Sequence, residues 1–360
     1  MVAMSGGVDS SVSALLLRRA GRPLAGMFMK NWEEEDPQGH CPADEDVRDA
    51  RAIADHLEIP FHARNFAVEY WDHVFTHFLN EYAQGRTPNP DILCNKEIKF
   101  LTFVEHARDL GASRIATGHY CRKRSEDGRH YLLKGVDENK DQSYFLHALN
   151  QDQLAVAEFP IGELAKPAVR QLALEADFPV HDKRDSTGIC FIGERQLKGF
   201  LSRYLKPRPG TILTTSGDVV GEHDGVHYYT LGQRQGLGIG GVRGAREAPW
   251  YVVAKDLDGR RLVVSQDHDH AALLCTELTL SNTNWITDPP AAGQHLQAKT
   301  RYRQADQNCV VSSIDPVAGQ CRVQFEQAQW AATPGQSVVF YAGPVCLGGG
   351  VIEWTNAAQI

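Results

Sequence analysis

Apolar residues up to about residue 120 form short continuous runs and longer segments in which they recur every three or four positions. The runs predict strands, and the periodic segments predict helices. The expected strands cover residues 23–29, 61–66 and 113–117, and the expected helices cover 43–57, 71–82 and 98–104. Strands and helices that alternate at this spacing form a parallel sheet with helices on both faces, so we expect an α/β domain.

The rest of the chain changes pattern twice. Residues 154–178 have helical periodicity that is interrupted at Pro160 and Pro167. After Pro207 glycine and threonine become frequent, and short runs predict strands at 228–231, 250–254, 262–265, 296–303, 309–314, 321–325 and 337–341. The glycine-rich stretch 232–241 has no helical pattern after it, so we interpret it as turns. We expect an α/β domain over 1–200, a small central β domain over 201–266 and a C-terminal β-barrel over 267–360.

The stretch Ser5-Gly6-Gly7-Val8-Asp9-Ser10 lies between the first apolar residues and the first helical segment. A helix that starts after such a turn presents unpaired amide groups and the positive end of its dipole, which favours an anion. Two glycines let the backbone wrap around a phosphate, the hydroxyls of Ser5, Ser10 and Ser11 add donors, and Asp9 could hold Mg²⁺ on a leaving pyrophosphate. The stretch has neither the lysine of a Walker A loop nor the G-x-G-x-x-G spacing.

The sequence S-G-G-x-D-S resembles the PP-loop of the N-type ATP pyrophosphatases. These enzymes cleave ATP to AMP and pyrophosphate and use the adenylyl group to activate a carbonyl oxygen. Ligands of parallel sheets bind beyond the carboxyl ends of the strands. We therefore expect the loop at residues 4–11, the segment after Met29 and the Gly118-His119 turn to surround one crevice.

The composition is that of a globular protein, with 42% hydrophobic and 23% charged residues. No apolar run approaches the roughly 18 residues of a membrane span, and no leader pattern is present, so we expect a cytoplasmic protein without membrane contact. The net charge of −8 argues against indiscriminate nucleic-acid binding but not against a local basic patch. The basic residues between Arg195 and Arg208 fit either a solvated helix face or a phosphate-binding stripe.

Two of the eight cysteines have unusual neighbours. Cys94 follows two prolines and Asp91 near an expected helix start, with Lys96 close by, and Cys190 lies in a turn flanked by basic residues. Both settings favour a thiolate. Either cysteine alone also fits a buried packing role. Beside an ATP-activating loop, two thiols suit sulfur transfer, since one can carry a persulfide and the other can attack its sulfur–sulfur bond. No cysteine spacing indicates a structural zinc site or a disulfide framework.

Several long blocks match one family, in order and over nearly the whole length. They are Asn89–Phe100, Lys140–Leu146, Asp185–Glu194, Leu231–Gly241, Lys299–Arg303 and Cys346–Gly350. The chain closely resembles the bacterial tRNA-specific 2-thiouridylases. The resemblance implies a sulfurtransferase with a PP-loop catalytic domain. Its partners would be the tRNAs for lysine, glutamate and glutamine and a sulfur donor of the sulfur-relay or cysteine desulfurase type.

The resemblance also implies a mechanism. ATP would transfer AMP to the C2 oxygen of the wobble uridine, which makes that oxygen a good leaving group. Cys190 would carry the persulfide sulfur, Cys94 would free it and leave a transient disulfide, and Asp91 would be the general acid/base. Asn89 and Pro90 would meet a target base that has been turned out of the anticodon-loop stack.

The implied binding residues form two groups. ATP and Mg²⁺ would be bound by Ala3, Met4, Ser5, Gly6, Gly7, Val8, Asp9, Ser10, Met29 and Gly118. Beyond Asn89, Pro90 and Asp91, tRNA would be contacted by His119, Lys140, Asp141, Gln142, Arg301, Tyr302 and Gln336. Without the resemblance, His119 reads as a structural histidine and the Arg301-Tyr302 pair as an exposed strand face. With it, the pair suits a phosphate contact and a stacking platform.

We expect a monomeric or weakly associating enzyme. One alternative is a PP-loop enzyme that delivers nitrogen, which should survive replacement of Cys94 and Cys190 by serine. The other is a nucleotide-sensing protein that binds ATP and tRNA without turnover. Release of pyrophosphate that depends on tRNA would exclude the sensor.

Overall fold

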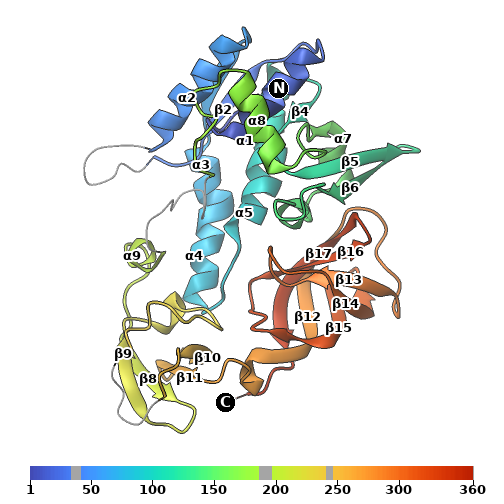
Figure 1. Cartoon of the computed structure of the whole chain (residues 1–360). Helices are drawn as coiled ribbons and strands as arrows, with labels where there is room; N and C mark the ends of the chain where they lie inside the picture. Colours follow the sequence, from blue (N-terminus) through green and yellow to red (C-terminus); the bar gives the residue numbers. More distant parts are fainter. Residues whose placement is uncertain (34–41, 186–196, 241–245, 360) are drawn as a thin grey trace.

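A computed structural model describes residues 1–33, 42–185, 197–240 and 246–359 (Figure 1). Its first part is built on a five-stranded parallel sheet in the order β3-β2-β1-β4-β7. The strands are β1 (Val2–Ala3), β2 (Gly26–Lys30), β3 (Phe61–Asn65), β4 (Ile115–Ala116) and β7 (Ala157–Glu158). The α/β prediction is therefore confirmed. The two-residue strand β7 was missed, because it lies inside a segment with helical periodicity.

Alternate residues of each strand enter two different cores, as the pleat of a strand requires. Val2 and Phe28 pack on one face with helices α1 (Val8–Arg19), α2 (Pro42–His56) and α8 (Lys166–Glu175). Ala3 and Met27 pack on the other face against the helical segments between residues 67 and 109 and against α7 (Gln151–Val156). Apolar runs in these strands follow from burial on both faces.

The direction of the strand order reverses at β1. The chain passes from β1 to β2 and β3 on one side and then places β4 on the other side of β1. Such a reversal opens a crevice beyond the carboxyl ends of the two strands. The loop at residues 4–7 follows β1 and Gly118 follows β4, so both lie at this crevice.

Two helical segments on the second face contain π-helical turns. One consists of α3 (Ala67–Tyr70), η1 (Trp71–Phe75) and α4 (Thr76–Ala83), and the other of α5 (Pro90–Leu93), η2 (Cys94–Thr102) and α6 (Phe103–Asp109). Apolar periodicity predicts both as helices, but it does not distinguish a π turn from an α turn. π-helical turns are frequently found at functional sites, and η2 begins at Cys94.

The central part contains helix α9 (Leu197–Leu201) and a four-stranded sheet in the order β10-β11-β8-β9. The strands are β8 (Gly210–Thr214), β9 (Val219–His223), β10 (Tyr251–Asp256) and β11 (Arg261–Ser265). The predicted strand at 228–231 is wrong, because Val226–Tyr228 is a 3₁₀ turn, η4, whose Tyr228 hydroxyl donates to the Leu205 carbonyl at 2.5 Å. The stretch 232–240 forms turns, as predicted, with Gly232, Gly236 and Gly238 at positive φ.

The C-terminal part is a six-stranded antiparallel barrel. Its strands, in spatial order, are β12 (Leu274–Trp285), β15 (Gln320–Trp330), β14 (Gln307–Asp315), β13 (His295–Lys299), β16 (Ser337–Ala342) and β17 (Val345–Thr355), and β12 pairs with β17 to close it. The strand predicted at 296–303 ends at Lys299. The Gln304 side chain accepts hydrogen bonds from the amide and hydroxyl of Thr300, which folds the chain into a turn.

A hairpin of the first part extends the sheet of the barrel. It consists of β5 (Cys121–Glu126) and β6 (Arg129–Lys134), and β6 pairs with β17. The barrel is thus hydrogen-bonded to the α/β unit through main-chain contacts (Figure 1). Among the described residues, no helix has both the length and the apolar character that crossing a membrane requires.

Candidate active site

The turn between β1 and α1 presents a row of backbone amides. Within the described part of the chain, no group accepts a hydrogen bond from the amides of residues 6–10. Gly6 has φ +74°, and a Cβ there would collide with the Asp46 carbonyl. Five unpaired amides at a helix start form a site for an anion such as a phosphate, and glycine is required where the turn meets α2.

The serine side chains of this turn point partly inward. The hydroxyls of Ser10 and Ser11 donate to the Gly7 carbonyl at 3.0 and 2.9 Å, and Ser11 is fully buried. Ser5 remains exposed, with its hydroxyl 3.2 Å from that of Ser10. The sequence predicted three hydroxyl donors for a phosphate, but burial removes Ser11 from that set. The backbone amides and the exposed Ser5 hydroxyl are left as donors.

The carboxylate of Asp9 is bound by a lysine from α8. The Lys166 ammonium lies 2.8 and 2.9 Å from the two Asp9 oxygens, and the Tyr120 hydroxyl donates to the same carboxylate at 2.7 Å. Lys166 is only 8% exposed, so this charge is sequestered beside the anion loop. The loop lacks a lysine in its own sequence, and the fold supplies one from a position 157 residues later.

Sequence reasoning missed Lys166, although the sequence does contain one signal. Lys166 is the first residue of α8, where a positive charge opposes the helix dipole, so a lysine there needs an acidic partner. Carboxylate oxygens are ligands that Mg²⁺ accepts, and a single carboxylate is enough when phosphates supply further ligands. Asp9 therefore fits a magnesium ion shared with a triphosphate, provided that Lys166 gives up its contact with this carboxylate.

Asp185 lies at the centre of a cationic cluster next to Lys166. Its oxygens accept from Lys140 at 2.6 Å, from Lys166 at 2.6 Å and from Arg170 at 3.1 Å. Burial would raise the pKa of Asp185, but the hydrogen bonds from Lys140 and Lys166 outweigh it and lower the pKa to about 2. Asp185 immediately precedes residues 186–196, which lie outside the described residues together with Cys190.

A second lysine reaches the anion loop from the same region. The Lys183 ammonium donates to the Gly6 carbonyl at 3.2 Å and contacts Asp46 at 2.8 Å and Asp49 at 2.5 Å. Burial opposes the charged form, yet the two carboxylates raise the pKa of Lys183. Lys183 thus connects the loop to α2, and Asp185 is connected to Asp9 of the loop through Lys166.

The residues expected at the adenine side lie at the crevice. Met29 is half-buried near the carboxyl end of β2. A Cβ on Gly118 would lie 2.8 Å from backbone atoms of Asp9 and Ser10, so only glycine allows β4 and α1 to approach this closely.

His119, expected to contact tRNA, is 9% exposed, and its Nδ1 lies 2.8 Å from the Thr117 hydroxyl. Burial and the nearby Lys99 lower the pKa of His119 well below the usual value. His119 is therefore a neutral side chain near physiological pH.

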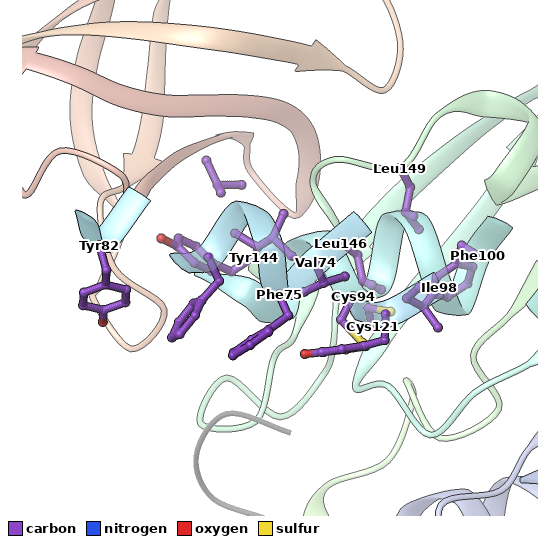
Figure 2. Close-up of a cluster of buried hydrophobic side chains, with 14 of the residues drawn as sticks. Val74, Phe75, Tyr82, Cys94, Ile98, Phe100, Cys121, Tyr144, Leu146 and Leu149 are labelled. Carbon is purple, nitrogen blue, oxygen red and sulfur yellow. The ribbon is translucent and has the colours of Figure 1, made fainter. Parts of the chain in front are cut away.

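The stretch that contains Asp91 and Cys94 begins with a capped helix. The Asn89 side chain accepts from the Asp91 amide at 3.2 Å, and Pro90 occupies the first turn, where a proline is tolerated. The Cys94 side chain has no exposed surface and lies in the buried cluster drawn in Figure 2, which also contains Cys121. A reagent therefore reaches Cys94 only when neighbouring residues move. The thiolate character predicted for Cys94 and Cys190 stays a prediction.

Four residues expected to contact tRNA lie close together. The Tyr302 hydroxyl donates to the Lys140 carbonyl at 3.3 Å, and its ring lies 4.4 Å from that of Phe145. The Gln142 side chain accepts from the Tyr120 amide at 2.9 Å. Asp141 is 5% exposed and accepts from the amide and hydroxyl of Ser143. Lys140 and Tyr302 remain partly accessible, whereas the Asp141 carboxylate organises a turn.

Arg301 and Gln336 lie near the segment that joins β15 to β16. The Arg301 guanidinium donates to the Ala331 carbonyl at 2.8 Å and lies over the Trp330 ring at 4.9 Å. The side-chain amide of Gln336 donates to the Thr87 carbonyl at 2.6 Å. These residues lie in turns, so the exposed strand face that the sequence left open for Arg301 and Tyr302 is wrong.

The basic stretch between Arg195 and Arg208 and the remaining cysteines add little to the candidate site. In the basic stretch, Lys198 forms an exposed ion pair with Asp224 at 2.5 Å. Among the described residues, no group of three or more His, Cys, Asp or Glu side chains could hold a metal ion. The described cysteines are all buried.

The parallel sheet with its amide-lined turn defines a nucleotide-binding α/β protein with two β domains attached. Family models agree with this description. The model for the tRNA methyl transferase HUP domain matches residues 1–194, that for the tRNA methyl transferase PRC-barrel domain matches 198–266, and that for the aminomethyltransferase beta-barrel domain matches 275–352.

Curated relatives match the chain over nearly its whole length. The tRNA-specific 2-thiouridylase MnmA of Hydrogenovibrio crunogenus is 56% identical over 354 residues, which cover 98% of this chain and 93% of that protein. The enzymes of the same name from Haemophilus ducreyi and a Psychrobacter species are 56% and 55% identical, each over 98% of this chain and 92% of that protein. The chain belongs to the tRNA-specific 2-thiouridylase family, which is a family of sulfurtransferases.

Proposed function

We propose that this protein uses ATP to replace the C2 oxygen of the wobble uridine by sulfur in the tRNAs for lysine, glutamate and glutamine, with AMP and pyrophosphate as products. The observation that carries the proposal is the row of unpaired amides at residues 6–10, in a chain that is 55–56% identical to named 2-thiouridylases. The amides suit the phosphates of ATP, and Lys166 and Lys183 add positive charge beside them.

The proposed chemistry proceeds in two steps. The C2 oxygen of the uridine attacks the α-phosphorus of ATP, and pyrophosphate leaves. The terminal sulfur of a Cys190 persulfide then bonds to C2 while the Cys94 thiolate attacks the inner sulfur. The sulfur–sulfur bond breaks, its electron pair stays with the transferred sulfur, and AMP leaves C2. Asp91 takes and returns the proton, and a dithiol reductant resets the Cys94–Cys190 disulfide.

Transfer of radiolabelled sulfur to unmodified glutamate tRNA tests the proposal, with ATP, magnesium and a persulfide source present. Wild type should label the tRNA only with ATP and should form AMP and pyrophosphate in equal amounts. The C94S and C190S variants should not label it, whereas C309S, which changes a buried barrel cysteine, should. Labelling by both C94S and C190S would refute the two-thiol chemistry. AMP formation without either thiol would favour the nitrogen-delivering alternative.

A second candidate, methyl transfer, comes from the description of the two N-terminal family models. Methyl transfer from S-adenosylmethionine needs no pyrophosphate site, so the amide row at residues 6–10 does not support methyl transfer. Supplying S-adenosylmethionine labelled in the methyl group instead of ATP decides between the two. Label in the tRNA under that condition would contradict thiolation as the main activity.

A further inference from the structure

Thr87 is the point at which all three parts of the chain meet. Its amide donates to the Pro334 carbonyl at 2.9 Å, and its carbonyl accepts from the Gln336 side chain at 2.6 Å. Its hydroxyl lies 3.1 Å from the Thr230 hydroxyl of the central part. The barrel therefore holds both main-chain polar groups of this residue, and the central domain holds its side chain. Thr87 is 9% exposed, so water does not compete effectively for these contacts.

Gly85, two residues before Thr87, is bound to the central domain as well. The Lys255 ammonium donates to the Gly85 carbonyl and, at 2.8 Å, to the Tyr229 carbonyl. Burial lowers the pKa of Lys255 to about 8. A Cβ on Gly85 would lie 2.6 Å from the Leu257 side chain. Lys255 thus connects the main chain at Gly85 to the main chain at Tyr229, although burial disfavours its charged form.

The barrel approaches Thr87 closely enough to require glycine. Gly335 has φ +93°, and a Cβ there would lie 2.9 to 3.0 Å from the Thr87 backbone. Gly335 and Gln336 are in turn tied to β17, since the Gly335 amide donates to the Ile352 carbonyl at 3.0 Å and the Ile352 amide to the Gln336 carbonyl at 2.7 Å. The Gly335 turn is thus a rigid part of the barrel.

The chain between Thr87 and the proposed catalytic residues is stiff. Pro88 and Pro90 fix their own φ, and each restricts the residue before it. Asn89 then caps the helix that contains Asp91 and leads directly into Cys94. A displacement of Thr87 is therefore passed on to Asp91 and Cys94 instead of being absorbed in a flexible loop.

We propose that Thr87 and Lys255 are positioning residues, which fix residues 85–87 to the central domain and the barrel and thereby set the positions of Asp91 and Cys94. The inference rests on the proposed function, because it assigns to the two β domains a role in that reaction. In this arrangement both β domains contribute to steps that take place on residues of the α/β part.

A matched pair of glycines tests the barrel contact. Gly335 and Gly293 both have positive φ in the barrel, but a Cβ on Gly293 meets nothing within 4 Å. Gly335→Ala should lower the kcat of tRNA thiolation by about 100-fold with an unchanged Kd for ATP, because a shift of about 1 Å in a reacting group has an effect of that size. Gly293→Ala should carry a similar backbone strain with kcat nearly unchanged. Equal kcat values for the two variants would overturn the proposal.

A matched pair of lysines tests the central-domain contact, and it also provides a readout that does not depend on activity. Lys255→Met should speed alkylation of the buried Cys94 thiol by about 10-fold, since a loosened segment opens more often. Lys198→Met, which removes only the exposed pair with Asp224, should not. Mass spectrometry of the peptide that contains Cys94 measures the alkylation rate. Lys255→Arg should restore much of the protection, because a guanidinium can donate to both carbonyls.

The outcomes separate this proposal from the proposed function. If wild type does not thiolate tRNA, the proposed function fails, and the alkylation rates alone decide on the positioning role. If Lys255→Met accelerates alkylation of buried barrel cysteines such as Cys309 as much as that of Cys94, Lys255 stabilises the whole fold and the positioning role is refuted. If Gly335→Ala does not fold, the lysine pair decides in the same way.

Discussion

Ion pairs hold the segments around the anion loop. In the segment before Asp91, hydrogen bonds that involve backbone groups hold Gly85 and Thr87, and Arg86 between them forms ion pairs with Glu81 and Glu353. Near the loop, Lys166 and Lys183 each contact two carboxylates. The partners of Gly85 and Thr87 are a carbonyl, a side-chain amide, a hydroxyl and the buried Lys255, whose ammonium also donates to the Tyr229 carbonyl. A charged ligand such as ATP competes directly with ion pairs but hardly with carbonyl contacts. The comparison suggests that the first region responds to the nucleotide and the second keeps its geometry.

The largest expected effect comes from changing the loop itself. Gly6→Ala should weaken ATP binding by about 100-fold, because the added Cβ collides with the Asp46 carbonyl and φ is +74°. Gly21 has a similar φ of +69° with nothing near its Cβ position, so Gly21→Ala should cost about 1 kcal/mol of stability and leave ATP binding intact. Equilibrium dialysis of ATP measures both. Equal loss in the two variants would show that strain, not the shape of the anion site, is responsible.

Removing the cation of this region should have the next largest effect. Lys166→Met leaves Asp9 and Asp185 without their shared partner, so pyrophosphate formation should fall by about 100-fold, as for loss of one strong donor in other active sites. Lys166→Arg should retain more activity because it keeps the charge.

The magnesium dependence of Lys166→Met distinguishes two roles for the lysine. If Lys166 competes with the metal for Asp9, the variant should need less Mg²⁺ to reach half of its own maximal rate. An unchanged requirement would contradict that exchange and leave Lys166 as a contact of the phosphates alone. ATP binding measured without magnesium provides the control.

The sequence was sufficient to predict the parts of the molecule that depend on local pattern. Apolar runs and periodicity located β2, β3, α2 and the three-part architecture. The S-G-G-x-D-S stretch predicted the turn and helix start that present the amide row, because glycines and a helix start act through neighbouring atoms; anion binding there stays a prediction. The row of amides at residues 6–10 follows from the turn itself, whereas Gly118 as an ATP-site residue stays a prediction from the family resemblance.

Contacts between distant segments could not be predicted in this way. Lys166 reaches Asp9 across 157 positions, and Thr87 meets residues 230, 334 and 336, which no local pattern connects. The burial of Ser11 depends on packing in the fold, which the sequence does not show. Its hydroxyl therefore donates to the Gly7 carbonyl and not, as the sequence predicted, to a phosphate. The strand predicted at 228–231 is wrong, because the Tyr228 amide donates to the Gly225 carbonyl in a 3₁₀ turn, and the strand predicted at 296–303 ends at Lys299, where the Gln304 side chain folds the chain into a turn.

Acid should weaken two parts of the molecule at different pH values, the contact of His147 with the barrel and the ion pairs of Asp185. His147, 3% exposed and next to the barrel, has its pKa lowered by burial to about 4. In the unfolded chain the histidine side chain has a pKa of about 6.5. The free energy of unfolding therefore has its full value above this pH and falls by about 3 kcal/mol as the pH decreases to about 4, because only the unfolded chain takes up the proton over this range. Asp185, with its pKa lowered to about 2, contributes above about pH 3.8, the ordinary value, and loses that contribution only below it.

Urea unfolding between pH 7 and pH 4 measures the slope of stability against pH. A His147→Gln variant should be less stable at pH 7 and should show a flatter slope over this window, because glutamine does not titrate. An unchanged slope would mean that another buried histidine, such as His119, dominates acid sensitivity. The ion pair between Lys166 and Asp185 should persist throughout, because the pKa of Asp185 is lowered to about 2.

The smallest expected effect concerns the contact between the Thr87 and Thr230 hydroxyls. Thr87→Val keeps both main-chain hydrogen bonds of the residue and removes only the hydroxyl, and Thr230→Val removes its partner. A double-mutant cycle should give a coupling of about 1 kcal/mol in unfolding free energy, typical of one buried hydrogen bond. The exposed hydroxyls of Thr214 and Ser216, 2.7 Å apart, provide a control cycle whose coupling should be smaller, because water replaces the lost partner. If the Thr87 cycle gives a larger coupling in kcat than in unfolding free energy, the hydroxyl contact positions the segment before Asp91. Equal couplings would mean that it only stabilises the fold.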